Sequence, residues 1–323
     1  MVVATFLGIN SFREVAQLFV NGILNGAGYG LLGAAFALIL GTTGRFHFAL
    51  ALNYALAGFL TAVLESDAGL PLGPAIVVGL AAGVLLSVLC EGIVYRALAS
   101  RAGVSTLLSV FVASLGLLIA GQNAMNLLWG STTRSLTGLN ETTVHISSVI
   151  FSSFALALLI AALVLCGGLE GILRRTGLGR QILAVRVNPL MASSVGVDVG
   201  RIFLIVFAIG GLLAGVAAIF QGLRFATTPD MGTKPIFYAL VVAFFAGTHR
   251  GPLFQLATGI AIGMVEAEST IWLSAKLSSL VVFGLLLLYL SETEIRATLE
   301  RARRRRRRPT ATARAAAGTA TLR

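Results

Sequence analysis

The sequence is poor in charge: Asp, Glu, Lys and Arg make up only 11% of its 323 residues, against roughly a quarter in an ordinary soluble domain. Hydrophobic residues account for 57%, and the mean hydropathy is +0.91. A water-soluble fold of this size would have too little polar surface to cover itself. Because apolar runs of about 20 residues match a hydrocarbon core about 30 Å thick, the composition predicts an integral membrane protein.

Histidine and cysteine are also scarce. The three histidines, His47, His145 and His249, do not cluster, and Cys90 and Cys166 stand at the ends of apolar runs without a C-x-x-C spacing. Such residues favour no metal site and no cofactor. No phosphate loop of the G-x-x-x-x-G-K-[ST] type occurs, and no nucleophile and base pattern points to an enzyme. If ATP drives this protein, we expect another chain to bind it.

Long apolar stretches predict an all-α, polytopic transmembrane bundle of about eight to nine spans. The segments are 15–40, 46–64, 74–96, 104–128, 148–170, 202–222, 236–248, 252–272 and 277–291. The segments 236–248 and 277–291 are short for a full crossing, which leaves room for tilt or for broken helices. Residues 1–14 form an N-terminal segment without the marks of a cleavable signal peptide, so we expect the first span to act as its own anchor.

Charge is distributed unevenly along the chain. The net charge is +11, but residues 292–323 contain ten arginines against three acids and so hold +7 of it. We expect this tail to be a disordered cytoplasmic segment that contacts anionic lipid rather than nucleic acid. With the N-terminus outside and the C-terminus inside, 19 of the 24 basic residues fall on the inner side, as the positive-inside rule requires.

Glycine recurs at spacings of four, as in Gly22/Gly26/Gly30 and Gly259/Gly263. Small residues at this spacing let helix backbones approach closely inside lipid. Close helix packing therefore explains most of these glycines. A second hypothesis is that the run from Gly22 to Gly30 lets the first helix bend or line a pathway.

The segment 173–201 between the fifth and sixth spans is long, basic and patterned. It carries an apolar stripe interrupted at Asn188-Pro189, which predicts a short two-part amphipathic helix on the inner side of the membrane. A plain connector would need no such stripe. We expect another protein to dock on it.

The same segment resembles the permeases of branched-chain amino acid ABC importers, in which an A-x-x-x-[DEN]-x-x-x-A-x-x-x-G-[IV] motif couples to the ATPase. The matching residues here are Ala184, Asn188, Ala192, Gly196 and Val197. The resemblance implies that these residues, with Pro189, form the ATPase coupling site. Spacing of four would keep Ala184, Asn188 and Ala192 on one face.

Other stretches resemble the family in the same order: Glu91 to Leu98, Asn126 to Ser131, and Gly247 to Glu266. The sequence departs from the family where an N-F-A-H-G segment is common, because residues 47–51 read HFALA. At Asn188 the family also commonly has an acidic residue, so a charge is missing from the expected coupling contact. These departures bear on the substrate more than on the class of transporter.

The resemblance implies a multi-pass subunit of the bacterial cytoplasmic membrane that carries branched-chain or other hydrophobic amino acids. The implied partners are a second permease chain, identical or related, two ABC ATPase subunits and an extracytoplasmic substrate-binding protein. A permease of the same family for urea, amides or another small polar solute is the alternative substrate class. A gradient-driven secondary transporter is the alternative of another kind, but it would typically show paired acids and bases inside the membrane, which we do not expect here.

Polar side chains on apolar helices are the candidates for the translocation path. They are Asn21, Asn25, Asn53, Asn123 and Glu266. Each amide must find a hydrogen-bond partner in lipid, either on another helix or in a cavity. Glu266 is a candidate for binding a substrate ammonium, with a solvated acid at the interface as the alternative. For Glu91, near the inner face, we expect a structural ion pair with Arg96, one turn away, or a side chain that snorkels to the interface.

Overall fold

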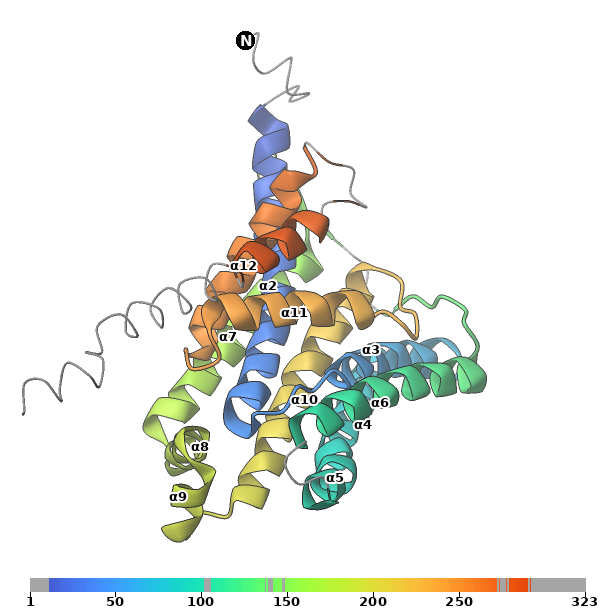
Figure 1. Ribbon diagram of the computed structural model, residues 1–323. Helices are drawn as coiled ribbons and strands as arrows, with labels where there is room; N and C mark the ends of the chain where they lie inside the picture. The colour runs from blue at the N-terminus through green and yellow to red at the C-terminus, as the bar shows by residue number, and fades with distance from the viewer. Residues whose placement is uncertain are drawn as a thin grey trace, which may run out of the picture.

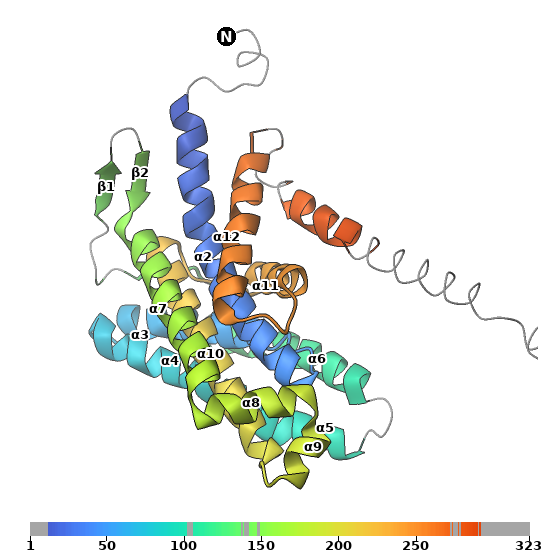
Figure 2. The same ribbon diagram turned by 90° about the vertical axis from the view of Figure 1, so that its left-hand side faces the viewer.

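The computed structural model describes residues 12–101, 106–136, 138, 142–146, 149–271, 273, 277, 279–289 and 291. These residues form helices and one small hairpin (Figures 1 and 2). The elements are α2 (Phe12–Thr43), α3 (Leu50–Ser66), α4 (Leu72–Leu89), the π-helical turn η1 (Cys90–Tyr95), α5 (Arg96–Arg101), α6 (Thr106–Trp129), β1 (Thr143–Ile146), β2 (Val149–Ser152), α7 (Ser153–Arg175), α8 (Gly177–Val187), α9 (Pro189–Ser194), α10 (Val199–Arg224), α11 (Thr233–Ala246) and α12 (Pro252–Ser269). A further apolar helix covers Ser279–Tyr289. The expected basic tail, residues 292–323, lies outside the described residues.

Among the described residues, five helices are long and apolar enough to cross a membrane. They are Glu14–Thr43, Leu72–Ala99, Leu108–Trp129, Ser153–Arg175 and Val199–Arg224. Three shorter apolar helices are Leu50–Ser66, Thr233–Ala246 and Ser279–Tyr289. Each apolar segment identified in the sequence overlaps a helix, so the predominantly helical, polytopic architecture is confirmed.

The hairpin β1–β2 was not expected, because the sequence predicted that a helix begins at residue 148. Thr143–Ile146 and Val149–Ser152 pair antiparallel, as their β-branched side chains favour. The helix begins only at Ser153, after the Ser152 hydroxyl accepts a hydrogen bond from a backbone N–H of its first turn. Gln17 of α2 exchanges two hydrogen bonds with the backbone of Ile150, at 2.6 and 2.9 Å, and so anchors the hairpin to the bundle.

The two ends of the bundle differ. One end carries α8 and α9, and the opposite end carries the hairpin and the N-terminal turn of α2 (Figure 2). We call these the α8–α9 end and the hairpin end. Helices α2, α7, α10 and α12 run between them, whereas α3, α4 and α6 cross them at a steep angle (Figure 1).

Burial divides the helices into a central and a peripheral set. Helix α2 packs against α12, α10, α11, α7 and α8, and the side chains of α3 and α10 are also largely buried. The peripheral α4, α6 and α7 turn large apolar side chains outward, including Val77 (65% exposed), Leu127 (87%) and Val164 (66%). A helix that is apolar all round belongs in a large core or in lipid, and here the outward faces fit lipid.

Helices α2 and α12 pack closely against each other through their glycines. A Cβ atom on Gly259 would overlap the backbone of Gly30, and one on Gly263 would overlap the backbone of Gly22 and Gly26. The structure therefore confirms that these glycines serve close helix packing.

Candidate functional site: a polar cavity and a distant exposed helix pair

A cavity of about 360 Å³ lies between α2, α3, α10, α11 and α12. It is bounded by the C-terminal ends of α10 and α12 and the N-terminal end of α11, all away from α8 and α9 (Figure 1). The described residues that line it are Asn25, Gly28, Tyr29, Tyr54, Ala217, Gln221, Phe225, Met231, Lys234, Pro235, Gly263, Glu266, Ala267 and Thr270. This combination of a few polar groups with apolar and aromatic walls is typical of a small-molecule site.

The charged side chains that line this cavity form one ion pair. Lys234 Nζ lies 3.2 Å from Glu266 Oε1, and the Tyr238 hydroxyl donates a hydrogen bond of 2.6 Å to the same oxygen. The ring of Tyr238 stacks on that of Tyr29, with centroids 4.3 Å apart. The carboxylate is therefore fixed from two sides within an otherwise apolar bundle, where an unpaired charge would be costly.

The structure brings only two of the five candidate pathway residues together. Asn25 and Glu266 line the cavity, whereas Asn21 accepts a hydrogen bond from Gln17 further along α2. Asn53 is fully buried beside His47. Asn123 lies on an exposed part of α6 and donates to a carbonyl of its own helix.

Sequence reasoning missed several lining residues, among them Tyr29, Tyr54 and Lys234. Lys234 precedes the apolar segment 236–248 in the sequence, and it lies in the first turn of α11. A lysine directly ahead of an apolar run was the available signal. Its partner Glu266 is 32 residues away, too far for any local pattern to reveal.

At the opposite end, α8 and α9 form the predicted two-part helix, interrupted at Asn188-Pro189. The Asn188 side-chain oxygen accepts hydrogen bonds from the backbone N–H groups of Leu190 and Met191, at 3.0 and 3.1 Å, and so caps α9. Pro189 occupies the first turn, where its missing N–H costs nothing.

The end of α9 is equally well defined. Gly196 has φ +86°, its N–H donates to the Ser193 carbonyl, and the N–H of Val197 donates to the Ala192 carbonyl, both at 3.0 Å. This is the Schellman arrangement, which favours glycine at the left-handed position. The chain then enters α10, whose N-terminus is capped by Asp198.

The expected coupling residues do not share one surface. Ala184 and Asn188 are exposed, but Ala192 is only 3% exposed and packs into the bundle. Four large apolar side chains of this element are also strongly exposed: Val187, Leu190, Met191 and Val195, at 69–85%. We call these four residues the α8–α9 patch.

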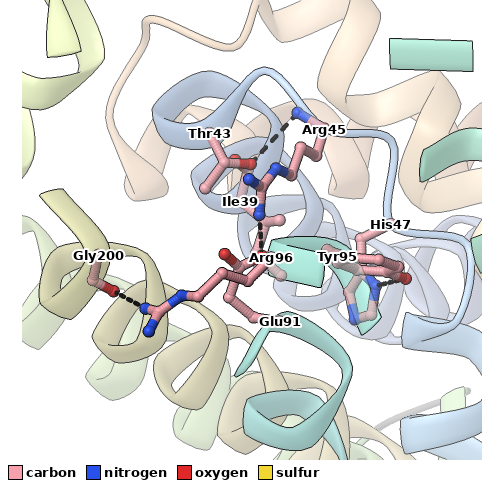
Figure 3. Close-up of polar contacts among 8 residues, drawn as sticks. All are labelled: Ile39, Thr43, Arg45, His47, Glu91, Tyr95, Arg96 and Gly200. Carbon is pink, nitrogen blue, oxygen red and sulfur yellow. Dashed lines mark hydrogen bonds and ion pairs between the residues drawn. The ribbon is translucent and has the colours of Figure 1, made fainter. Parts of the chain in front are cut away.

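A polar cluster joins three helices near this end (Figure 3). Glu91 of η1 forms an ion pair with Arg45, which follows α2, so the expected pairing with Arg96 is wrong. Arg96 turns the other way and donates a hydrogen bond of 3.1 Å to the carbonyl of Gly200, in the first turn of α10 (Figure 3). The π-helical turn sets these directions, because it inserts an extra residue into the helical repeat.

Beside this ion pair, His47 Nδ1 lies 2.8 Å from the Tyr95 hydroxyl, as Figure 3 shows. His47 Nε2 lies 3.2 Å from Asn53 Nδ2, and Asn53 Oδ1 is buried without a hydrogen-bond partner among the described residues. Glu91 and Glu266 each pair with a base, Arg45 and Lys234, that lies just outside the apolar segments identified in the sequence.

Comparison with known proteins agrees with this architecture. Residues 18–290 match the family described as branched-chain amino acid transport system, permease component. The chain is 26% identical over 290 residues to the high-affinity branched-chain amino acid transport system permease protein BraD of Pseudomonas aeruginosa, covering 85% of this chain and 92% of BraD. It is 25% identical over 294 residues to LivH of Escherichia coli, covering 86% and 94%.

A solved structure, PsaBC from Streptococcus pneumoniae in complex with Fab, aligns with a TM-score of 0.47 and 11% identity over 90% of this chain and 95% of that one. The family match covers most of the residues between the first apolar helix and the last. The chain is a multi-pass membrane protein that belongs to the permease component family of branched-chain amino acid transport systems.

Proposed function

We propose that this chain is the translocation subunit of an ABC importer for branched-chain or other hydrophobic amino acids. The observation that carries the proposal is the separation of two surfaces on one bundle. A polar cavity lies toward the hairpin end, and an apolar two-part helix is exposed at the other. Substrate enters the cavity, and the ATPase binds the exposed two-part helix.

The α8–α9 patch is the docking surface for the ATPase. Exposed apolar side chains that lie together mark protein interaction sites, and Val187, Leu190, Met191 and Val195 lie on a short rigid element. Asn188, Pro189 and Gly196 fix the shape of that element, while Ala192 and Val197 tie it to the bundle and Ala184 borders the patch. Closure of the ATPases on ATP then shifts the helices between two states. Coupling requires that the ATPases contact α8 and α9 differently in these two states.

Further subunits complete the transporter. A second permease packs against the outward apolar faces, two ATPase subunits bind the inner end, and an extracytoplasmic binding protein delivers substrate to the cavity. The N-terminus lies outside and the C-terminus inside, where the basic tail contacts anionic lipid.

Two alternatives have an observation in their favour. The amides of Asn25 and Gln221 in the cavity would also suit urea, an amide or another small polar solute. The pairing of Lys234 with Glu266 is a feature of gradient-driven transporters as well. The energy source separates the second alternative from an ABC importer.

The test begins with purification of the tagged chain from its native membrane. We expect a nucleotide-binding chain to be recovered with it. Uptake of leucine, isoleucine and valine should stop on ATP depletion and continue with a proton uncoupler. The reverse dependence would establish a gradient-driven transporter, and uptake of urea or amides alone would move the substrate to the alternative class.

A paired substitution tests the docking surface. Leu190→Ser together with Met191→Ser should abolish recovery of the ATPase, because both side chains lie in the α8–α9 patch. Val164→Ser removes an equally exposed apolar side chain from α7 and should leave recovery unchanged. Normal recovery and uptake in the double variant would contradict the proposed role of α8 and α9.

A further inference from the structure

The cavity between α2, α3, α10, α11 and α12 is lined by one cationic and one anionic side chain. Among the described residues that line it, Lys234 and Glu266 alone carry a full charge, and they face each other at 3.2 Å. In the present state each charge neutralises the other. A ligand that enters must either leave this pair intact or replace it.

The two members of the pair are held very differently. Glu266 is only 12% exposed, and Tyr238 holds the same oxygen that meets the lysine. The Lys234 side chain is 60% exposed, and beyond Glu266 its ammonium is near only the ring of Tyr238, 5.4 Å from its centroid, among the contacts of the described residues. The anion is therefore fixed, whereas the cation has room to move.

This asymmetry selects the charge of the ligand. A ligand with only a positive charge would pair with Glu266 and leave Lys234 without its counterion, and a ligand with only a negative charge would do the opposite. Breaking one side of a partly buried pair is costly. A zwitterion pairs with both residues at once, since its ammonium meets the carboxylate and its carboxylate meets the displaced ammonium.

The remaining walls suit an apolar side chain. Tyr29, Tyr54, Phe225, Met231 and Pro235 surround the ion pair. The volume of about 360 Å³ lies in the range of about 300–1,000 Å³ that small-ligand sites occupy. Charged ends and an apolar body are the two parts of a hydrophobic α-amino acid.

We propose that Glu266 and Lys234 form a zwitterion site, in which Glu266 binds the α-ammonium and Lys234 swings aside to bind the α-carboxylate of the transported amino acid. Tyr238 is a positioning residue that holds the Glu266 carboxylate in place. This inference rests on the proposed function, because it assigns the ligand contacts of the same cavity.

The test uses the complete transporter, with its ATPases and binding protein, in proteoliposomes that take up radiolabelled leucine. Glu266→Gln and Lys234→Met should each lower uptake by about 10- to 100-fold, the range expected when one hydrogen bond to a charged group is lost. Lys234→Arg should keep most of the uptake. Asp230→Asn, a neutralised acid that does not line the cavity, is the matched control and should leave uptake unchanged.

A charge exchange distinguishes a binding site from a structural ion pair. The double variant Lys234→Glu with Glu266→Lys keeps one charge of each sign in contact, so it should recover the thermal stability lost in Glu266→Gln. It should not recover uptake, because the apolar walls fix the orientation of the amino acid and each of its ends then meets a like charge. Recovery of both stability and uptake would overturn the zwitterion site.

Assembly and substrate-independent ATP hydrolysis report whether each variant is folded. If Glu266→Gln fails to assemble, Lys234→Met carries the test, because the lysine is largely exposed. The site would be refuted if the unaltered transporter takes up leucine and both Glu266→Gln and Lys234→Met change that uptake by less than twofold. The proposed function would then still stand. Absence of ATP-dependent amino acid uptake by the unaltered transporter would refute both.

Discussion

Asn188 illustrates how one side chain sets the shape of a functional element. Its oxygen caps α9 through the N–H groups of Leu190 and Met191. Asn and Asp are about equally good at this task, which gives a physical reason why the motif accepts either residue. The absence of an acidic residue at position 188 therefore does not remove the capping hydrogen bonds.

Gly259 gives a second case, and a prediction. In Gly259→Ala the new Cβ would overlap the backbone of Gly30, so α2 and α12 must separate. We expect a loss of about 1–3 kcal/mol of stability, as for other overpacked sites, measured as an earlier transition in an SDS unfolding titration. Gly171→Ala on α7 is the control, because its Cβ would meet nothing within 4 Å; equal tolerance of both changes would contradict the close contact.

Asp67 offers a test by pH. The hydrogen bond from Arg134 holds the pKa of Asp67 below its ordinary value of 3.8, with a smaller contribution from Ser66. Because the pKa is lowered by folding, the ion pair stabilises the protein above about that value and the contribution is lost as the pH falls through the lowered pKa. The melting temperature of Asp67→Asn should therefore lie below that of the unaltered protein at pH 6, and the gap should narrow as the pH falls below 3.8. A gap that stays constant below that pH would mean that another interaction of Asp67 stabilises the protein.

At the scale of the elements, η1 connects α4 to both α2 and α10. Its Glu91 pairs with Arg45, and the adjacent Arg96 binds the carbonyl of Gly200. The side chain of Glu91 is 1% exposed and that of Arg45 is 12% exposed. The ion pair with Arg45 is thus shielded from water, whereas Arg96, which makes the contact to α10, is exposed.

Removing one member of this pair should be more harmful than removing both. Glu91→Leu leaves the Arg45 cation buried without its counterion, and we expect a loss of about 3–5 kcal/mol in the SDS titration. The double variant Glu91→Leu with Arg45→Met should recover most of that loss. A double variant as unstable as the single one would show that the ion pair adds net stability of its own.

Local patterns predicted the elements better than their partners. The break at Asn188-Pro189 could be read from the sequence because a cap and a proline act within one turn. The hairpin β1–β2 was missed because its apolar residues continue into the apolar run of α7. The partner of Glu91 was predicted from closeness in sequence, and the structure pairs it with a residue 46 positions away instead.

At the scale of the whole molecule, the cavity and the α8–α9 patch lie toward opposite ends of one bundle. The nine apolar segments, the glycine spacing and the family could all be recognised in the sequence. The cavity could not, because its walls come from five elements that only the fold brings together. Of the five candidate pathway residues, the two that line it were distinguishable from the rest only by their tertiary contacts.

The orientation of the bundle can be measured by cysteine labelling in intact cells. Asn25→Cys should react with a membrane-impermeant thiol reagent, because Asn25 lines the cavity. Gln181→Cys, at an exposed position of α8 outside the α8–α9 patch, should react only after permeabilisation. Cys90 and Cys166 are 2% and 0% exposed, so we expect a low background from both. Labelling of Gln181→Cys in intact cells would reverse the proposed orientation.

Helix α2 is continuous over 32 residues, a rod of roughly 48 Å at 1.5 Å per residue. Asn25 faces the cavity, and Gly41 near its other end lies against Arg186 of α8. Because a single helix touches both places, we expect a tilt at one end to reach the other without a relay of side chains. Under the proposed function, a break in the middle of α2 should therefore uncouple ATP hydrolysis at the α8–α9 end from transport through the cavity.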